Sequence, residues 1–385
     1  NYGMNGWCAH HNTDIWRSTG AGGNWGEGNP HWATWNMAGA WLSAHLFEHY
    51  RFTGDRQFLQ EKAWPVMKGA AEFCLDWLIT DKSGQLISVP SVSPENTFIT
   101  NKGDTAQISV NTTSDIALIK QLFTNCIRAS RILKSDQEFC EKLKKAIQEL
   151  PDYSIGSKQQ LLEWTSGEWN SVDPAHRHLS HMYPVYPGDE ISPNTTPQLS
   201  EAAKKALSLR TKTNSSWGFA WKAACWARLG EGDSAWQTWQ YQLQYMDPSP
   251  QTQSGKYGLF PNFFNSEGNA VILNGNGCAT AVLTEMLLQS HTDTIQLLPA
   301  LPKPFGKGTI KGICARNGFV VDLDWKDHQL THATITSTLG NECRIRPGKK
   351  IKIYDQEKEQ KITKVGNETY VFNTKKGHHY SIIAQ

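Results

Sequence analysis

Four polar segments of the chain carry side chains that can transfer protons or bind hydroxyl groups. Histidines, carboxylates and amides are concentrated in them to a degree that packing does not require. The segments are residues 6–16 (GWCAHHNTDIW), 91–96 (SVSPEN), 173–181 (DPAHRHLSH) and 274–277 (NGNG). The sequence therefore places a candidate site in these segments.

Glu95 is the strongest candidate for acid–base chemistry. It lies in a loop between Pro94 and Asn96, directly after an apolar run. A carboxyl held in this way acts as a general acid if its pocket raises its pKa. The alternative is an ordinary loop carboxylate, which a single Glu usually is. The same alternative applies more strongly to Asp14 and Asp173, because each is placed to cap the following turn or helix.

The histidines of two segments allow a second kind of chemistry. On spacing alone they could bind a metal ion, although no Cys and few carboxylates accompany them. The alternative is a hydrogen-bonded network that orders the loops and binds hydroxyl groups. The residues concerned are His10, His11, His176, His178 and His181. We expect the network, with neither a metal ion nor a cofactor.

The segment at Asn274 opens a helix and offers backbone N–H groups to a bound oxygen, or is a plain turn. No Lys-Ser/Thr pair of the phosphate-binding kind follows it, so nucleotide binding is rejected. The chain also lacks a Gly-x-Ser-x-Gly motif, which weakens a serine hydrolase interpretation.

Composition excludes several classes of function. The 385 residues include 38 Lys and Arg against 36 Asp and Glu, so the net charge of +2 gives no reason to expect nucleic acid or membrane surfaces as partners. No run of apolar residues is long enough for a membrane span. The 16 Trp residues are unusually many, and flat aromatic rings suit the faces of sugars. The eight Cys are scattered without a CxxC pair, which is typical of buried thiols.

Helical periodicity organises the first three quarters of the chain. Gly54 and Asp55 stop one helix and start the next, because glycine suits a left-handed position and Asp suits an N-cap. Apolar residues at helical spacing predict helices at 32–52, from 55 onward, 114–134, 136–150, 217–229, 234–245 and 279–290. Helical hairpins separated by long polar loops favour a toroid of paired helices.

The pattern changes near residue 292. Short alternating runs follow, at 295–298, 320–325, 333–337, 351–354, 369–372 and 380–383. Turn residues separate them, which is typical of an antiparallel β-sandwich. We expect a helical catalytic domain over 1–292 and a β-sandwich domain over 293–385.

Longer motifs resemble glycoside hydrolase family 95, which contains α-L-fucosidases and some α-L-galactosidases. They span nearly the whole chain in the expected order: 6–16, 38–55, 65–78, 93–96, 173–188, 217–233, 285–291 and 297–325. The resemblance implies an (α/α)6 barrel followed by a C-terminal β-domain. It also implies an N-terminal β-domain and early barrel helices upstream of Asn1, so we expect this chain to be the C-terminal part of a longer protein.

The resemblance assigns roles to single residues. Family members invert the anomeric centre, with an acid on the glycosidic oxygen and a base on the attacking water. The acid of the Ser-Pro-Glu-Asn motif corresponds to Glu95. The base is an Asp whose position, counted back from Glu285, is occupied here by Asn274. An amide orients water but does not accept its proton. Three explanations of this replacement remain open. Another carboxylate acts as the base, the activity is weak or directed at a different sugar, or the correspondence of the two sequences is locally out of register.

Sugar contacts follow from the same resemblance. The segment containing His176 and His178 is similar to the family's sugar-contacting loop. Trp32 or Trp35 is a candidate platform for the sugar ring, with a place in the core as the alternative.

We expect a glycosidase that removes terminal α-L-fucosyl or related L-sugar residues from a fucosylated or similar glycan. The alternative is a carbohydrate-binding protein of the same fold with weak or no hydrolysis, because Asn274 replaces the base; a purely structural toroid is a weaker third hypothesis. Export to the periplasm or the medium is inferred from the family.

Overall fold

The structure is a computed structural model that describes residues 2–13, 15–17, 29–210, 215–247, 257–267, 270–366 and 368–385. The chain forms two compact units. The first consists of Asn1–Tyr50 and Asp55–Lys212, and the second of Arg51–Gly54 and Thr213–Gln385.

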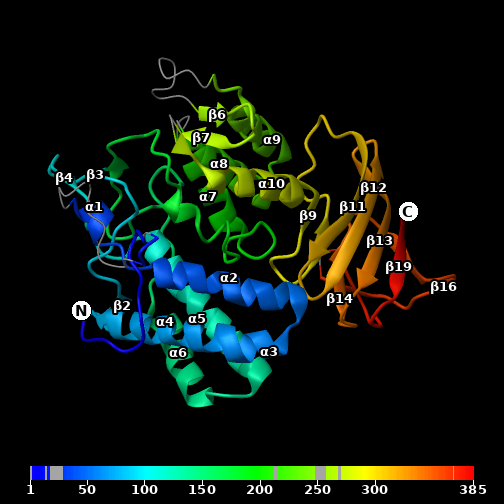
Figure 1. The fold of residues 1–385 in the computed structure, drawn as a ribbon, viewed down its shortest axis with the longest axis horizontal. Coiled ribbons are helices and arrows are strands. Elements are labelled where there is room, and N and C mark those ends of the chain that lie inside the picture. Colours follow the sequence, from blue (N-terminus) through cyan, green and yellow to red (C-terminus); the bar gives the residue numbers. More distant parts are fainter. Residues whose placement is uncertain are drawn as a thin grey trace. The chain divides into compact units, whose positions relative to one another are not determined.

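The first unit is mainly helical (Figure 1). Its helices are α1 (Pro30–Ala33), α2 (Ala38–Thr53), α3 (Arg56–Phe58), α4 (Trp64–Trp77), α5 (Thr113–Leu133), α6 (Gln137–Glu149) and α7 (Pro197–Leu209), with a π-type turn at Leu59–Ala63 and a 3-10 turn at Ser180–Met182. The predicted turn after α2 is confirmed. Gly54 has a φ of +67°, and the Asp55 side chain accepts a hydrogen bond from the Phe58 N–H.

Two helices of this unit differ from the prediction. The helix predicted at 32–52 is broken between α1 and α2, where residues 34–37 leave the helical path. Helix α7 was not predicted, although Pro197 at its first position is a recognised start signal.

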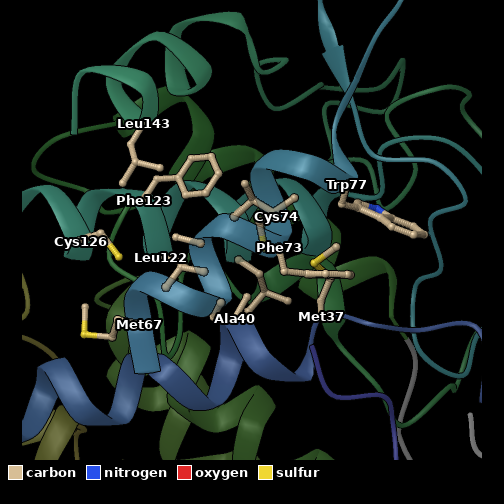
Figure 2. Packing of buried hydrophobic residues seen from close by; sticks show 14 of the residues in the cluster. Met37, Ala40, Met67, Phe73, Cys74, Trp77, Leu122, Phe123, Cys126 and Leu143 are labelled. Carbon is tan, nitrogen blue, oxygen red and sulfur yellow. The ribbon is translucent and has the colours of Figure 1, made fainter. Parts of the chain in front are cut away.

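The core of the first unit lies where α2, α4, α5 and α6 meet. Figure 2 shows side chains from all four helices packed together. Fully or almost fully buried members include Met37, Ala40, Met67, Phe73, Cys74, Leu122, Phe123, Cys126 and Leu143. Fourteen of the 21 residues of α5 are buried, whereas α6 buries only one face. Helix α5 is therefore an inner helix that α6 covers.

Short strands border the loops at the N-terminal end of α5. They are β1 (Ile79–Thr80), β2 (Leu86–Ile87), β3 (Phe98–Ile99), β4 (Thr105–Ala106) and β5 (Asn170–Ser171). Strand β3 pairs with β4 on one side and with β5 on the other. This small sheet ties the segment after Glu95 to the segment before His176.

The second unit begins with helices and small strands: α8 (Ser216–Arg228), α9 (Gly232–Gln240), a 3-10 turn at Tyr241–Leu243, β6 (Tyr257–Leu259), β7 (Asn265–Glu267), β8 (Ala270–Val271) and α10 (Leu273–Leu287). Helix α10 starts six residues before the helix predicted at 279–290. Asn274 therefore lies in the first turn of a helix. Helices α8 and α10 are joined by a buried ion pair from Arg228 to Glu285.

Two sheets form the rest of the second unit, visible as the orange and red strands of Figure 1. Their strands are β9 (Leu288–Gln289), β10 (Ile295–Leu297), β11 (Lys307–Ala315), β12 (Phe319–Lys326), β13 (Gln329–Ser337), β14 (Cys343–Arg346), β15 (Ile351–Asp355), β16 (Lys358–Glu359), β17 (Thr363–Val365), β18 (Thr369–Phe372) and β19 (His379–Ala384). The six-stranded sheet has the order β11-β12-β13-β19-β15-β16, and the five-stranded sheet β17-β18-β14-β10-β9.

A shared apolar core joins these sheets. Val321, Ile335 and Ile382 come from the six-stranded sheet, and Ile345 and Phe372 from the other. The alternation along β12, buried at every second residue, is the predicted sandwich pattern. One pairing departs from the prediction of a purely antiparallel domain, since β10 and β14 run parallel. No helix among the described residues has both the length and the apolar character required to cross a membrane.

Candidate active site

The loop that carries Glu95 rests on the N-terminal end of α5. Thr112 caps this helix by accepting a hydrogen bond from the Asp115 N–H. The buried Asp115 carboxylate in turn accepts hydrogen bonds from Ser88 Oγ at 3.0 Å and Ser91 Oγ at 2.7 Å. These bonds fix the start of the loop to a helix that the core holds in place.

A second buried carboxylate fixes the centre of the loop. Glu163 Oε1 accepts hydrogen bonds from Ser93 Oγ at 2.6 Å and Asn96 Nδ2 at 2.9 Å, on either side of Glu95. Its other oxygen accepts from Arg210 Nη2 at 2.7 Å. Glu163 is only 8% exposed, and a buried carboxylate without such partners is strongly unfavourable. The three bonds therefore hold the Ser-Pro-Glu-Asn turn in one conformation.

The Glu95 carboxylate is surrounded by cationic and donor side chains. Its Oε1 lies 2.9 Å from His11 Nε2, and its Oε2 lies 3.2 Å from His178 Nε2. Arg177 Nη2 donates a hydrogen bond to the same Oε2. The Glu95 side chain is 7% exposed. The structure thus brings together three of the four polar segments singled out in the sequence.

These contacts set the protonation state of the free site. Burial raises the pKa of the Glu95 carboxyl, but hydrogen bonds from His11 and His178 and the charge of Arg177 outweigh it. The pKa is therefore held well below its ordinary value, and Glu95 is a carboxylate in this arrangement. The pocket does not raise the pKa as the general-acid prediction required.

The histidines divide into two protonation classes. The hydrogen bond to Glu95 raises the pKa of His11. Burial lowers the pKa of His178, and it lowers the pKa of His176 and His181 to about 4. His11 is therefore the histidine that shares a proton with Glu95, while the other three stay neutral donors and acceptors.

The loop that contains His176 is tied to Glu95 through the main chain as well. His176 Nε2 lies 3.0 Å from the Glu95 carbonyl oxygen, and its Nδ1 accepts a hydrogen bond from the His178 N–H. His176 thus orders the segment, while His178 and Arg177 contact the carboxylate. Within the described ranges, no group of three or more His, Cys, Asp and Glu side chains is arranged to hold a metal ion.

Both tryptophans singled out in the sequence lie beside His11. The ring centroids of Trp32 and His11 are 5.6 Å apart, and those of Trp35 and His11 are 6.4 Å apart. Trp35 is 8% exposed and belongs to the hydrophobic core. Trp32 is half-buried, so it is the better placed of the two to offer a ring face to a sugar. Asp14 lies outside the described residues.

Asn274 belongs to the second unit, and its surroundings there differ from those of Glu95. It is exposed in the first turn of α10, and its Oδ1 accepts a hydrogen bond from the Gly275 N–H at 2.9 Å. Nearby in this unit, Ser215 Oγ and Trp217 Nε1 both donate to the Glu267 carboxylate at the start of α8.

A cavity of about 210 Å³ lies beside Glu163 rather than at Glu95. Its lining includes Trp164, Trp169, His181, Arg210 and Glu163. Ser93, Asn96 and Arg210 already donate hydrogen bonds to the Glu163 oxygens. The cavity therefore borders the residues that hold the loop at 91–96.

Two residues of the site, Arg177 and Glu163, were not among the candidates named from the sequence. His11 was named as a member of a histidine network, but its contact with Glu95 was not predicted. Glu163 carried a readable signal, as a single charge in the apolar run Leu161-Leu162-Glu163-Trp164. A charge in such a run is buried with a partner, but the sequence does not say which partner.

Comparison with known proteins identifies the family of the chain. The model of the glycosyl hydrolase family 95 catalytic domain matches residues 1–287, and that of the glycoside hydrolase family 95 C-terminal domain matches residues 289–382. Alpha-L-fucosidase 2 of Arabidopsis thaliana is 37% identical over 332 residues, which cover 86% of this chain and 39% of that protein. Probable alpha-fucosidase A of Aspergillus niger is 28% identical over 319 residues, covering 77% of this chain and 38% of that protein.

Among solved structures, a putative kojibiose phosphorylase from the human microbiome is similar in fold, with a TM-score of 0.52 and 10% identity. The match covers 88% of this chain and 49% of that structure. The chain spans less than half the length of the relatives it matches. Two family models that together cover nearly every residue, and a relative at 37% identity, place the chain in glycoside hydrolase family 95.

Proposed function

We propose that the protein containing this chain is a glycosidase that removes terminal α-L-fucosyl or related L-sugar residues from glycans, with inversion. The observation that carries the proposal is the buried Glu95 carboxylate, held by His11, Arg177 and His178. The fucosidase names of the relatives support the L-sugar, and nothing in the comparisons supports a carbohydrate-binding protein without hydrolysis. We propose that the helices contribute to an (α/α)6 barrel over 1–292, followed by the β-sandwich over 293–385.

Glu95 is the proposed general acid, and its proton must arrive with the substrate. Arg177 helps His11 and His178 to keep the free carboxylate ionised, and its side chain is 30% exposed. A bound sugar that engages Arg177 and excludes water removes stabilisation from the charged form, which raises the pKa of Glu95. The proton shared with His11 is then available to Glu95, which passes it to the glycosidic oxygen as the bond breaks.

The sugar itself is held by the groups around this carboxylate. His178 contacts a sugar hydroxyl, and Trp32 offers a ring face. His176, whose two ring nitrogens bond the Glu95 carbonyl oxygen and the His178 N–H, positions the sugar-contacting loop. By the family correspondence, Asn274 takes the role of orienting the attacking water, without removing its proton. We propose a glycan outside the cytoplasm as the substrate, in the periplasm or the medium.

The test is fucose release from a 2′-fucosylated oligosaccharide by the complete gene product. Glu95→Gln keeps the shape of the acid but not its proton, so the rate of release should fall by about 10²–10⁴-fold. Calorimetric binding of the same oligosaccharide should persist, because the surrounding donors remain.

Glu141→Gln is a matched control, since this exposed carboxylate on α6 pairs only locally with Lys144. It should release fucose at the unchanged rate. Wild-type protein that binds the oligosaccharide tightly and releases nothing would exclude the glycosidase proposal. A Glu95→Gln variant as active as Glu141→Gln would exclude Glu95 as the acid.

A further inference from the structure

Asn274 is followed by glycine, and Asn-Gly is the dipeptide in which an asparagine amide is most easily lost. Glycine has no side chain to shield its nitrogen, so that nitrogen can attack the neighbouring amide carbon. We propose that Asn274 is a site of spontaneous deamidation, and that this modification creates a carboxylate at the position where the proposed hydrolysis lacks a base. The second half of the inference rests on the proposed function, whereas the first does not.

The structure places the Asn274 amide oxygen against the Gly275 nitrogen. The Asn274 side chain folds back along its own chain, and its Oδ1 accepts the Gly275 N–H at 2.9 Å. Gly275 lies in the first turn of α10, where backbone N–H groups have no acceptor within the helix. The nitrogen that must attack is therefore not held by a helical hydrogen bond, and Asn274 is exposed to water.

A second Asn-Gly pair two residues later provides an internal contrast. The Asn276 side chain is held at both ends. Its Oδ1 accepts a hydrogen bond from the Asn265 N–H at 2.9 Å, and its Nδ2 donates to the Phe263 carbonyl at 2.8 Å. Attack on Asn276 requires both bonds to break, whereas attack on Asn274 requires the rotation of an exposed amide and the loss of one local bond, that from the Gly275 N–H. The local geometry therefore favours deamidation at Asn274 over deamidation at Asn276.

The reaction needs only water. The Gly275 nitrogen forms a bond to Asn274 Cγ, the Cγ–Nδ2 bond breaks, and Nδ2 leaves as ammonia with the proton from the Gly275 nitrogen. Water then opens the cyclic imide. Cleavage of the new N–Cγ bond gives aspartate, and cleavage of the original peptide bond gives isoaspartate. Either product carries a carboxylate, which the positive N-terminal end of α10 stabilises.

The functional consequence concerns the attacking water. An amide orients water, whereas a carboxylate also accepts its proton, and general-base assistance is worth about 10²–10⁴-fold in rate. Aspartate at residue 274 would supply that assistance to the mechanism proposed above. Freshly made protein should therefore hydrolyse slowly, and its activity should increase with time.

The modification is tested without any substrate. The complete gene product is incubated at mildly alkaline pH, sampled over days and digested for peptide mass spectrometry. Deamidation adds about 1 Da, and fragmentation assigns it to one residue. We expect conversion at Asn274 to be at least about tenfold faster than at Asn276, a ratio that corresponds to 1.4 kcal/mol in the barrier. In urea, where the structure is lost, the two sites should convert at similar rates.

The consequence is tested by substitution and ageing. Asn274→Asp should release fucose at least about 10²-fold faster than fresh wild type, and aged wild type should move toward it in proportion to the aspartate formed. Asn274→Gln, whose longer side chain disfavours ring closure, should gain no activity on ageing relative to its own starting value.

The outcomes separate the two halves of the inference. Equal conversion at Asn274 and Asn276 in the folded protein overturns the modification site. Conversion at Asn274 with no hydrolysis by wild type, aged wild type or Asn274→Asp leaves the modification standing and refutes the proposed function. Hydrolysis by fresh wild type that neither ageing nor Asn274→Asp accelerates overturns the link between them.

Discussion

At the scale of single residues, the environment of Glu95 is unusual for a proton donor. Burial and cationic neighbours act on its pKa in opposite directions, and the neighbours prevail in the free protein. The sequence identified Glu95 by its motif, but not the balance of forces on it. That balance depends on His11 and Arg177, which lie 84 residues before and 82 residues after it in the chain.

Arg177 is one of the groups that lower the pKa of Glu95, after His11 and His178, so it contributes to the pH range of activity. A general acid must be protonated, so its pKa sets the alkaline limb of the rate profile. Arg177→Gln removes a positive charge that lowers the pKa of Glu95, so the alkaline limb of kcat/KM should move to higher pH. Arg177→Lys keeps the charge and should move the limb less.

The measurement is the pH dependence of kcat/KM for fucose release by both variants. A limb that shifts equally in Arg177→Gln and Arg177→Lys, or that shifts to lower pH, would show that the charge of Arg177 does not act on Glu95.

At the scale of elements, the decisive feature is the loop at 91–96 and its two buried carboxylate supports. Local signals such as the Asp55 cap, the Gly54 turn and the alternation along β12 were readable, because each depends on neighbours in the sequence. The pairing of Glu163 with Arg210 and with Ser93 was not, because it joins residues 47 and 70 positions apart. The parallel pairing of β10 with β14 was missed for the same reason.

Glu163 should make stability depend on pH. Burial opposes its ionisation, but Arg210, together with His181 and the hydrogen bonds from Ser93 and Asn96, outweighs burial and lowers the pKa of Glu163 from 4.5 to about 2. A depressed pKa contributes stability that is complete above pH 4.5 and is lost as the pH falls toward 2. Glu163→Gln should cost about 3–5 kcal/mol near neutral pH, because it leaves Arg210 without its buried partner. The cost should shrink below pH 4.5.

Glu190 provides a control of opposite sign. Burial raises the pKa of this carboxyl to about 7. The stability that Glu190 contributes is complete below pH 4.5 and is lost as the pH rises to 7. Glu190→Gln does not titrate, so it should gain stability relative to wild type over that range. Denaturant unfolding of both variants at several pH values tests the pair. Parallel pH dependences in the two variants would contradict the assigned shifts.

At the scale of the whole chain, two divisions have to be distinguished. The family models divide the chain near residue 288, and the sequence pattern predicts a division at 292, whereas the compact units divide it at 212. Within the second unit, hydrogen bonds connect helices α8 and α9 to the segments that form and border the sheets. Gln289 Nε2 donates to the Ala227 carbonyl of α8, and the Lys303 N–H donates to Asp233 of α9.

Hydrogen exchange should follow the compact units. Amides of α8 and α10 should open with the same free energy as those of β12 and β13, and with a different free energy from those of α5. Exchange of α8 and α10 together with α5, and apart from the strands, would support the division at 292 instead.

The packing of Gly275 has a consequence for any preparation of this protein. A Cβ at this position would lie 2.4 Å from Asn265 Oδ1, so a residue other than glycine after Asn274 requires the Asn265 side chain on β7 to shift. Exchange of this neighbour for a bulkier residue, the usual way to slow the loss of an amide, therefore disturbs the packing against β7. Stored samples should therefore separate into species of differing isoelectric point, and the age of a batch becomes a variable that every kinetic comparison has to record.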